Sequence, residues 1–248
     1  LNEKYAFLEV LKNYSLKNKH KKLILIPGND EYTKLIVENT EYLKEYYYFN
    51  VCSEEILNSF LSKNKFYETY KNKLDLPKTY IFTCGKEKID LKNISYFMYP
   101  LILKPCNAVN YFKNEFPGQA KVFKIESEEE LLEIIKRIEK SGYREGIIIQ
   151  EFIPGDDSLL FDSMFYVGTD KKAKLMSFAQ IGLQEHTKEG VGNCTVLVNG
   201  YNEFNNTDII KYKLKDFLEE IGYQGYCEVD LKFDRRDNKF KVFEINAR

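Results

Sequence analysis

Short apolar runs alternate with amphipathic segments along the first third of the chain. An apolar run at residues 21–26 ends in a Pro-Gly turn and leads into a helical pattern over residues 31–45. This order of strand, turn and helix is typical of an α/β unit. A second strand is expected at residues 46–51, followed by a helix over residues 53–74 that breaks near its middle. Pro77 marks the first boundary, because the residue before a proline avoids helical geometry.

The next segment has two short buried strands, at residues 79–83 and 99–105, before its helix. A Ser-Glu-Glu-Glu run that begins at Ser127 predicts a capping box at the start of that helix. The helix has one apolar face, and Gly142 stands where a left-handed cap is preferred. Another buried strand is expected at residues 146–150.

The last third repeats this mixture of elements. Strands are expected near residues 162–168 and 175–183, a helix over 208–221, and a terminal hairpin over 225–233 and 240–248. Strands and helices do not alternate strictly, so the pattern predicts an α+β fold in which two subdomains follow a partial α/β unit.

The terminal hairpin carries the most specific chemistry. A turn centred on Asp237 places Asp230 opposite Glu244, and Glu228 opposite Asn246. Opposite residues share a face of the ribbon, so these four polar side chains gather on one side. A solvated face gives the same alternation, but carboxylates directly opposite each other repel and need a cation. Oxygen ligands of this kind suit Mg²⁺. The other face is expected to be core and collects Cys227, Val229, Leu231, Phe233, Phe243, Ile245 and Ala247.

Two lysines and one turn are further candidates for a ligand-binding site. Lys104 ends a buried strand and Lys65 precedes a helix; each is ordinary alone, but together they suit the phosphates of a nucleotide. The segment from Gln150 to Asp157 passes from buried strand to a Pro-Gly turn with two acids. It is either a solvated turn or a hinge whose backbone recognises adenine and whose aspartate binds ribose. His186 is one of two histidines and carries a weaker prediction.

Composition narrows the function classes. The 248 residues carry 37 Lys and Arg against 38 Asp and Glu, which argues against a general nucleic-acid binder. The longest stretch without a charged residue, 190–202, is rich in Gly and Asn, so no membrane span is expected. Five scattered cysteines without a C-x-x-C pair favour a reducing, cytoplasmic location. Neither a signal peptide nor an initiator Met is visible.

In chain order, these motifs resemble the ATP-grasp superfamily, and the resemblance covers essentially the whole chain. Its most specific part is the final E-x-N-x-R with an acid upstream. Within the superfamily the chain is similar to the D-aspartate ligase type of carboxylate-amine ligase. The resemblance implies a pre-ATP-grasp α/β domain at residues 1–76 and two ATP-grasp subdomains at 77–153 and 154–248, with further residues expected beyond either terminus. The loop from Cys106 to Gln119 has one glycine where many relatives have several, which leaves its closure over ATP open.

The resemblance also implies roles for residues. ATP phosphates would contact Lys65 and Lys104, while the hinge, with Gln150, Glu151, Ile153, Asp156 and Asp157, would bind adenine and ribose. Magnesium would be held by Asp230, Glu244 and Asn246, and the reacting groups would meet Arg248, Glu228 and His186. The implied reaction joins a small-molecule carboxylate to an amine through an acyl phosphate, with ATP and magnesium as cofactors, and its substrates would include D-aspartate or a similar amino acid and a cell-wall precursor.

Two alternatives stay open. One is an enzyme similar to carbamoyl phosphate synthase or biotin carboxylase, which uses bicarbonate. The other is a catalytically silent nucleotide-binding module. Neither the oligomeric state nor the identity of the substrates follows from these residues.

Overall fold

The computed structural model describes residues 3–18, 21–185, 187, 193–200 and 207–248. Its N-terminal block is mostly helical and holds one small parallel sheet. The block consists of α1 (Glu3–Lys17), β1 (Leu23–Ile24), α2 (Asp30–Glu38), α3 (Thr40–Leu43), β2 (Tyr47–Tyr48), α4 (Glu54–Leu61) and α5 (Lys63–Tyr70). Helix α1 was not predicted. The two strands predicted in this block, β1 and β2, contain only two residues each. The helix expected over 53–74 does break, at Ser62, whose side chain caps α5.

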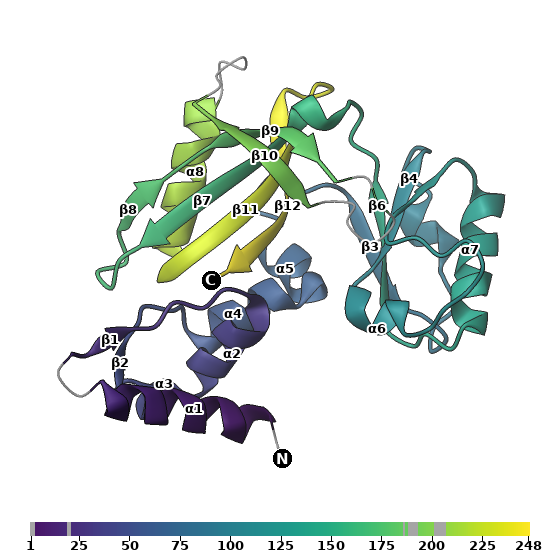
Figure 1. Cartoon of the computed structure of the whole chain (residues 1–248). Coiled ribbons are helices and arrows are strands. Elements are labelled where there is room, and N and C mark those ends of the chain that lie inside the picture. The colour runs from purple at the N-terminus through teal and green to yellow at the C-terminus, as the bar shows by residue number, and fades with distance from the viewer. Residues whose placement is uncertain (1–2, 19–20, 186, 188–192, 201–206) are drawn as a thin grey trace.

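A four-stranded antiparallel sheet forms the second block, in the order β3-β6-β4-β5. Helix α7 covers one face of this sheet, as Figure 1 shows. The predicted cap is present, because the Ser127 side chain accepts a hydrogen bond from the Glu130 N–H at 3.2 Å. The elements are β3 (Thr79–Thr83), the 3-10 helix η1 (Leu91–Ile94), β4 (Leu101–Pro105), α6 (Ala108–Phe112), β5 (Phe123–Ile125), α7 (Glu128–Lys140) and β6 (Gly146–Glu151).

A larger antiparallel sheet forms the third block, in the order β10-β9-β7-β11-β12, and β8 also pairs with β7. The strand expected at residues 175–183 is in fact two strands, β8 and β9, and β10 was not predicted. The block contains η2 (Asp157–Leu159), β7 (Leu160–Val167), β8 (Ala173–Met176), β9 (Ala179–Gln184), β10 (Cys194–Asn199), α8 (Thr207–Glu220), β11 (Gly225–Asp234) and β12 (Lys239–Ala247).

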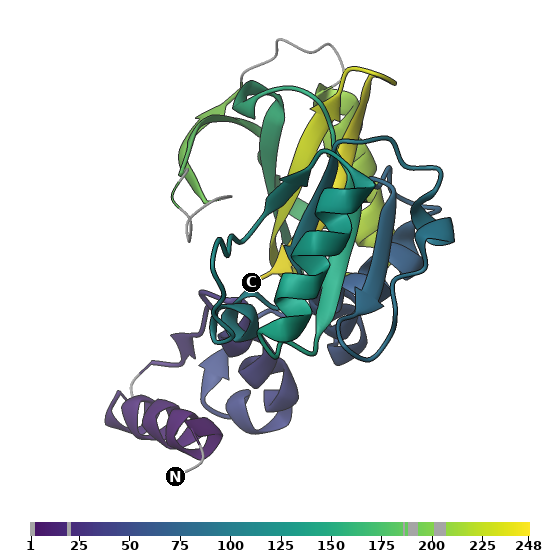
Figure 2. The same cartoon turned by 90° about the vertical axis from the view of Figure 1, so that its right-hand side faces the viewer.

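Helices from two parts of the chain pack into the same core as the larger sheet. Helix α8 contributes Leu214 and Phe217 to its core, and the N-terminal block contributes Leu57 and Phe66 from α4 and α5. The edge strand of the larger sheet, β12, contacts α2 and α4 of the N-terminal block, and the C-terminus lies beside this block (Figures 1 and 2).

The predicted domain boundaries at residues 76 and 153 stay proposals. They are supported by the sheets, because the four-stranded sheet lies within residues 77–153 and the larger sheet within 154–248. Among the described helices, none is long and apolar enough to cross a membrane.

One ion-pair cluster ties the two larger sheets together. Arg236, in the turn between β11 and β12, donates to both carboxylate oxygens of Asp234 and also to Glu151 at the end of β6, at 3.0 Å. The Asp234 side chain is 2% exposed. Burial alone would raise the pKa of Asp234, but the hydrogen bonds from Arg236 outweigh it and hold this pKa below its ordinary value. The turn of one sheet is thus fixed to the edge of the other.

Replacing Arg236 with alanine would leave the Asp234 carboxylate buried without its guanidinium. We expect Arg236→Ala to lower the free energy of unfolding by about 1–3 kcal/mol at pH 7, measured by urea denaturation. The control is Arg137→Ala, since Arg137 pairs with the exposed Glu133 on α7; it should cost about 0.5 kcal/mol or less. Equal losses in the two variants would contradict this role.

The same pair predicts a pH dependence. Because the folded-state pKa of Asp234 is depressed, its stabilisation is present above the unfolded pKa of about 4 and is lost as pH falls through the folded value. The difference in unfolding free energy between wild type and Arg236→Ala should therefore narrow below about pH 4. A difference that is the same at pH 7 and pH 3 would rule this out.

Candidate functional site

The terminal hairpin brings its polar residues together as predicted. Asp230 pairs with Glu244 and Glu228 pairs with Asn246, and the Asn246 amide donates to Asp230 Oδ2 at 3.3 Å. These residues share one face of the ribbon because side chains alternate along each strand. The face turns towards a cavity of about 680 Å³ between the two larger sheets.

The register near the turn differs from the prediction. Phe233 pairs with Phe240 there, so the turn is not centred on Asp237, and a bulge next to Asp230 shifts the pairing by one residue. The bulge changes the face of Phe243, which lines the cavity instead of entering the core as expected. Val242 is buried in the core instead.

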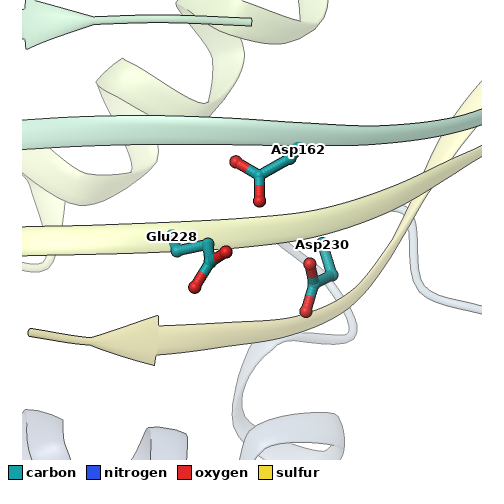
Figure 3. A group of neighbouring side chains, drawn as sticks. All are labelled: Asp162, Glu228 and Asp230. Carbon is teal, nitrogen blue, oxygen red and sulfur yellow. The ribbon is translucent and has the colours of Figure 1, made fainter. Parts of the chain in front are cut away.

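A carboxylate that the sequence analysis missed joins this face from the neighbouring strand. Asp162 on β7 lies directly opposite Asp230 on β11. Its side chain is 4% exposed, and its Oδ2 atom has no hydrogen-bond partner. Oxygen atoms of Asp162, Glu228 and Asp230 lie within 4.8 Å of one another, and Figure 3 shows Glu228 and Asp230 on β11 with Asp162 on the neighbouring β7. Finding Asp162 from sequence requires knowing that β7 pairs with β11 and in which register.

This crowding changes how the carboxyl groups titrate. Burial raises the pKa of Asp230 well above its ordinary value, and the negative charges of Glu244, Glu228 and Asp162 add to the shift. Burial likewise raises the pKa of Asp162 to about 8, with Glu228 contributing. The face therefore cannot hold all of its negative charges at neutral pH without a cation nearby.

Two lysines supply part of that positive charge. Lys63, the first residue of α5, forms an ion pair with Glu244. Burial would raise the pKa of Glu244, but Lys63 and Lys104 outweigh it and lower this pKa to about 2. Burial, then the charge of Lys63, lowers the pKa of Lys104 to about 8. The Lys104 Nζ atom lies 5.6 Å from the centre of the Phe243 ring.

The structure places Lys65 outside the central cavity. Lys63 and Lys104 line the central cavity, whereas Lys65 lines a separate hollow beside Ser59 and Tyr70. The reason is helical geometry. Residues two positions apart on a helix point about 200° away from each other, so Lys63 and Lys65 cannot face the same site. The cavity lining therefore favours Lys63, and a phosphate contact by either lysine stays a prediction.

Arg248 connects the acidic face to the N-terminal block. Its guanidinium contacts Asp30 at the start of α2 and donates to Glu228 at 3.3 Å. Its backbone N–H donates to Tyr226 O at 2.8 Å, which fixes the last residue to β11. The predicted residue His186 lies outside the described residues.

The hinge residues are not among the described residues that line the cavity. Gln150 is buried and its amide donates to the Tyr67 hydroxyl at 2.7 Å and to Thr79, so its side chain serves the packing between α5 and the sheet. The N–H of Glu151 donates to Lys78 O at 2.9 Å, so this N–H already has a partner within the protein. Ile153 is buried.

The two aspartates of the hinge stand in its turn. Asp156 is exposed and accepts hydrogen bonds from the N–H and hydroxyl of Ser158, so it caps η2. Asp157 is the first residue of η2 and is half-buried. A ribose-binding role stays a prediction for either residue.

Comparison with known proteins shows the fold of this chain. The chain is 35% identical over 234 residues to D-aspartate ligase of Enterococcus faecium (strain Aus0004), which covers 93% of the chain and 54% of that protein. It superimposes with a TM-score of 0.63 on the D-alanine–D-alanine ligase of Bacillus anthracis complexed with ATP, at 14% identity over 100% of the chain and 73% of that structure. The chain has the ATP-grasp fold.

The ATP-grasp prediction and its α+β class are therefore confirmed. N5-carboxyaminoimidazole synthetase of Staphylococcus aureus, complexed with ADP, shows the same fold with a TM-score of 0.60, at 18% identity over 97% of the chain and 57% of that structure. No family model matches the chain. The chain spans about half the length of the curated relative that it matches.

The crowding of carboxylates predicts that one of them destabilises the protein when divalent cations are absent. We expect Asp162→Asn to raise the free energy of unfolding by about 1 kcal/mol in chelator-treated buffer, because it removes one of three mutually repelling groups. Asp216→Asn is the control, since the Asp216 side chain is 75% exposed, and should change stability by about 0.5 kcal/mol or less. A clear loss of stability in Asp162→Asn would contradict the repulsion.

Proposed function

We propose that the chain is an ATP-dependent carboxylate-amine ligase that forms an amide through an acyl phosphate. The observation that carries this proposal is the cavity of the ATP-grasp fold, where lysines from two blocks face a cluster of carboxylates. Such an arrangement suits a triphosphate with its cation. The similarity to D-aspartate ligase supports the same reaction class.

In this proposal, Lys104 and Lys63 contact the phosphates of ATP. Lys63 replaces the predicted Lys65 because it lines the cavity. The hinge would bind the base with the carbonyl of Glu151 and the N–H of Ile153, and Asp157 or Asp156 would accept hydrogen bonds from ribose hydroxyls.

Magnesium fits the residues of the acidic face. Asp230, Glu244 and Asn246 would hold it, since hard oxygen ligands are what Mg²⁺ prefers, and burial and the like charges of its neighbours raise the pKa of Asp230, which a bound cation would oppose. When bound, the ion neutralises charge that develops on the β- and γ-phosphates.

The chemistry then follows from the charged groups around the cavity. An oxygen of the substrate carboxylate attacks the γ-phosphorus, the bond to the β-phosphate oxygen breaks, and ADP leaves. Arg248 would stabilise the transferred phosphoryl group, and Glu228 would line the substrate side. The amine attacks the acyl carbon, inorganic phosphate leaves, and the amine loses a proton. The role of His186 stays a prediction.

For substrates, we propose D-aspartate or a similar amino acid as the carboxylate, joined to an amine on a cell-wall precursor. This part rests on the name of the relative from Enterococcus faecium. The cytoplasmic location, which was inferred from the cysteines, also stays a prediction.

Hydroxylamine tests the reaction class without knowledge of the natural amine. It opens an acyl phosphate to a hydroxamate, so we expect the protein, Mg-ATP and hydroxylamine to produce ADP and a hydroxamate in equal amounts when D-aspartate is added. L-aspartate and D-alanine serve as matched acids. Omission of the acid should reduce ADP release to the background rate.

Two outcomes would select the alternatives. ADP release that depends on bicarbonate and needs no amino acid would identify an enzyme similar to carbamoyl phosphate synthase or biotin carboxylase. Bound ATP without ADP release across a broad panel of acids would identify a silent nucleotide-binding module.

The two lysines of α5 provide a matched pair for the nucleotide site. We expect Lys63→Met to weaken ATP binding at least about tenfold, because it removes a charged hydrogen bond to phosphate. Lys65→Met should change the dissociation constant by less than about twofold, since Lys65 lines a different hollow. Calorimetric titration with a non-hydrolysable ATP analogue measures both. The reverse order of effects would restore the original assignment of Lys65.

A further inference from the structure

The three carboxylates between β7 and β11 form a compact set of oxygen ligands. Asp162 and Asp230 are direct neighbours across the two strands, and Glu228 lies two residues before Asp230 on the same face. Their oxygen atoms lie within 4.8 Å of one another. Oxygens on opposite sides of one divalent ion, at bonds of about 2.0–2.6 Å, are about 4–5 Å apart. The spacing therefore matches a single shared ion (Figure 3).

The charges around this set are compensated unevenly. Glu228 accepts from Arg248 at 3.3 Å, and Glu244 is paired with Lys63. Asp230 accepts at 3.3 Å from the amide of Asn246, which is neutral. Among the described residues, no ion pair reaches Asp162 or Asp230. When Asp162 and Asp230 are both ionised, two negative charges on adjacent strands suit a divalent cation better than a monovalent one.

A second observation comes from Asp162 alone. Its side chain is 4% exposed, and Oδ2 is one of the few buried polar atoms in the described residues that has no hydrogen-bond partner. Leaving a buried carboxylate oxygen unsatisfied costs free energy. The side chain points towards Glu228 and Asp230 (Figure 3), where a bound ion would satisfy it.

We propose that Asp162, Glu228 and Asp230 bind a divalent cation without nucleotide, and that Asp162 is a ligand in addition to the three residues of the magnesium site above. The ion would lie between β7 and β11, whereas the predicted ligands stand on β11 and β12. Asp230 belongs to both sets and would place this ion next to the one that accompanies ATP. The site does not depend on the ligase reaction, because the proposed binding of the ion requires neither nucleotide nor substrate.

Mn²⁺ is the probe, because its electron paramagnetic resonance signal separates free from bound ion. We expect the chelator-treated wild-type chain to bind Mn²⁺ without ATP, and Asp162→Asn to bind it at least about tenfold more weakly. The control Asp216→Asn removes the same charge from the exposed surface of α8 and should bind Mn²⁺ within about twofold of wild type. Glu228→Gln gives the same test through a second ligand.

The possible outcomes distinguish a divalent-cation site from a site for another ligand. Equal Mn²⁺ affinity in wild type and Asp162→Asn, with both variants folded by thermal melting, would overturn the proposal. The proposal would also be overturned if the wild-type chain bound no Mn²⁺ in the absence of ATP. Tighter binding of an amino-acid ammonium group than of Mn²⁺ at this face would overturn it as well. Failure of the hydroxylamine assay would leave the Mn²⁺ result unaffected, so the two proposals fail separately.

Discussion

Repulsion between carboxylates at the junction of β7, β11 and β12 is the constraint around which the rest of the molecule is arranged. Each of the three blocks supplies a positive charge to the same place: Lys63 from the N-terminal helices, Lys104 from the small sheet and Arg248 from the end of the chain. Arg248 in turn holds Asp30 of α2. The electrostatics of one face therefore join elements that are far apart in sequence.

These positive charges are distributed in a way that suits catalysis more than stability. Lys63 and Arg248 form ion pairs with Glu244 and Glu228, whereas no ion pair among the described residues reaches Asp162 or Asp230. A protein selected only for stability gains nothing from such a group. Unsatisfied carboxylates beside a cavity are typical of sites where a ligand supplies the missing charge, which is why this face carries both the proposed function and the additional cation site.

Local patterns in the sequence predicted the hairpin and its polar face, because strand side chains alternate with a period of two over a short, continuous segment. The bulge could not be predicted, yet it leaves the pairing of Asp230 with Glu244 intact and moves only Phe243 out of the core. Asp162 was missed because its partner lies almost 70 residues away across β7 and β11. The choice between Lys63 and Lys65 depended on where α5 begins, and helix ends are not defined to one residue by sequence patterns.

The hinge shows a second kind of feature that the sequence did not predict, namely its tertiary contacts. Its turn was recognised, but the buried contacts of Gln150 and the bridge from Glu151 to Arg236 come from tertiary packing. The central claim is that the acidic face and the two lysines bind a triphosphate together with its cation. A crystal structure with magnesium and a non-hydrolysable ATP analogue tests it most directly: the account predicts metal within about 2.0–2.1 Å of Asp230 and Glu244 oxygens, with the phosphates between Lys63 and Lys104. A nucleotide bound in the hollow beside Lys65, or carboxylates turned away from the phosphates, would contradict it.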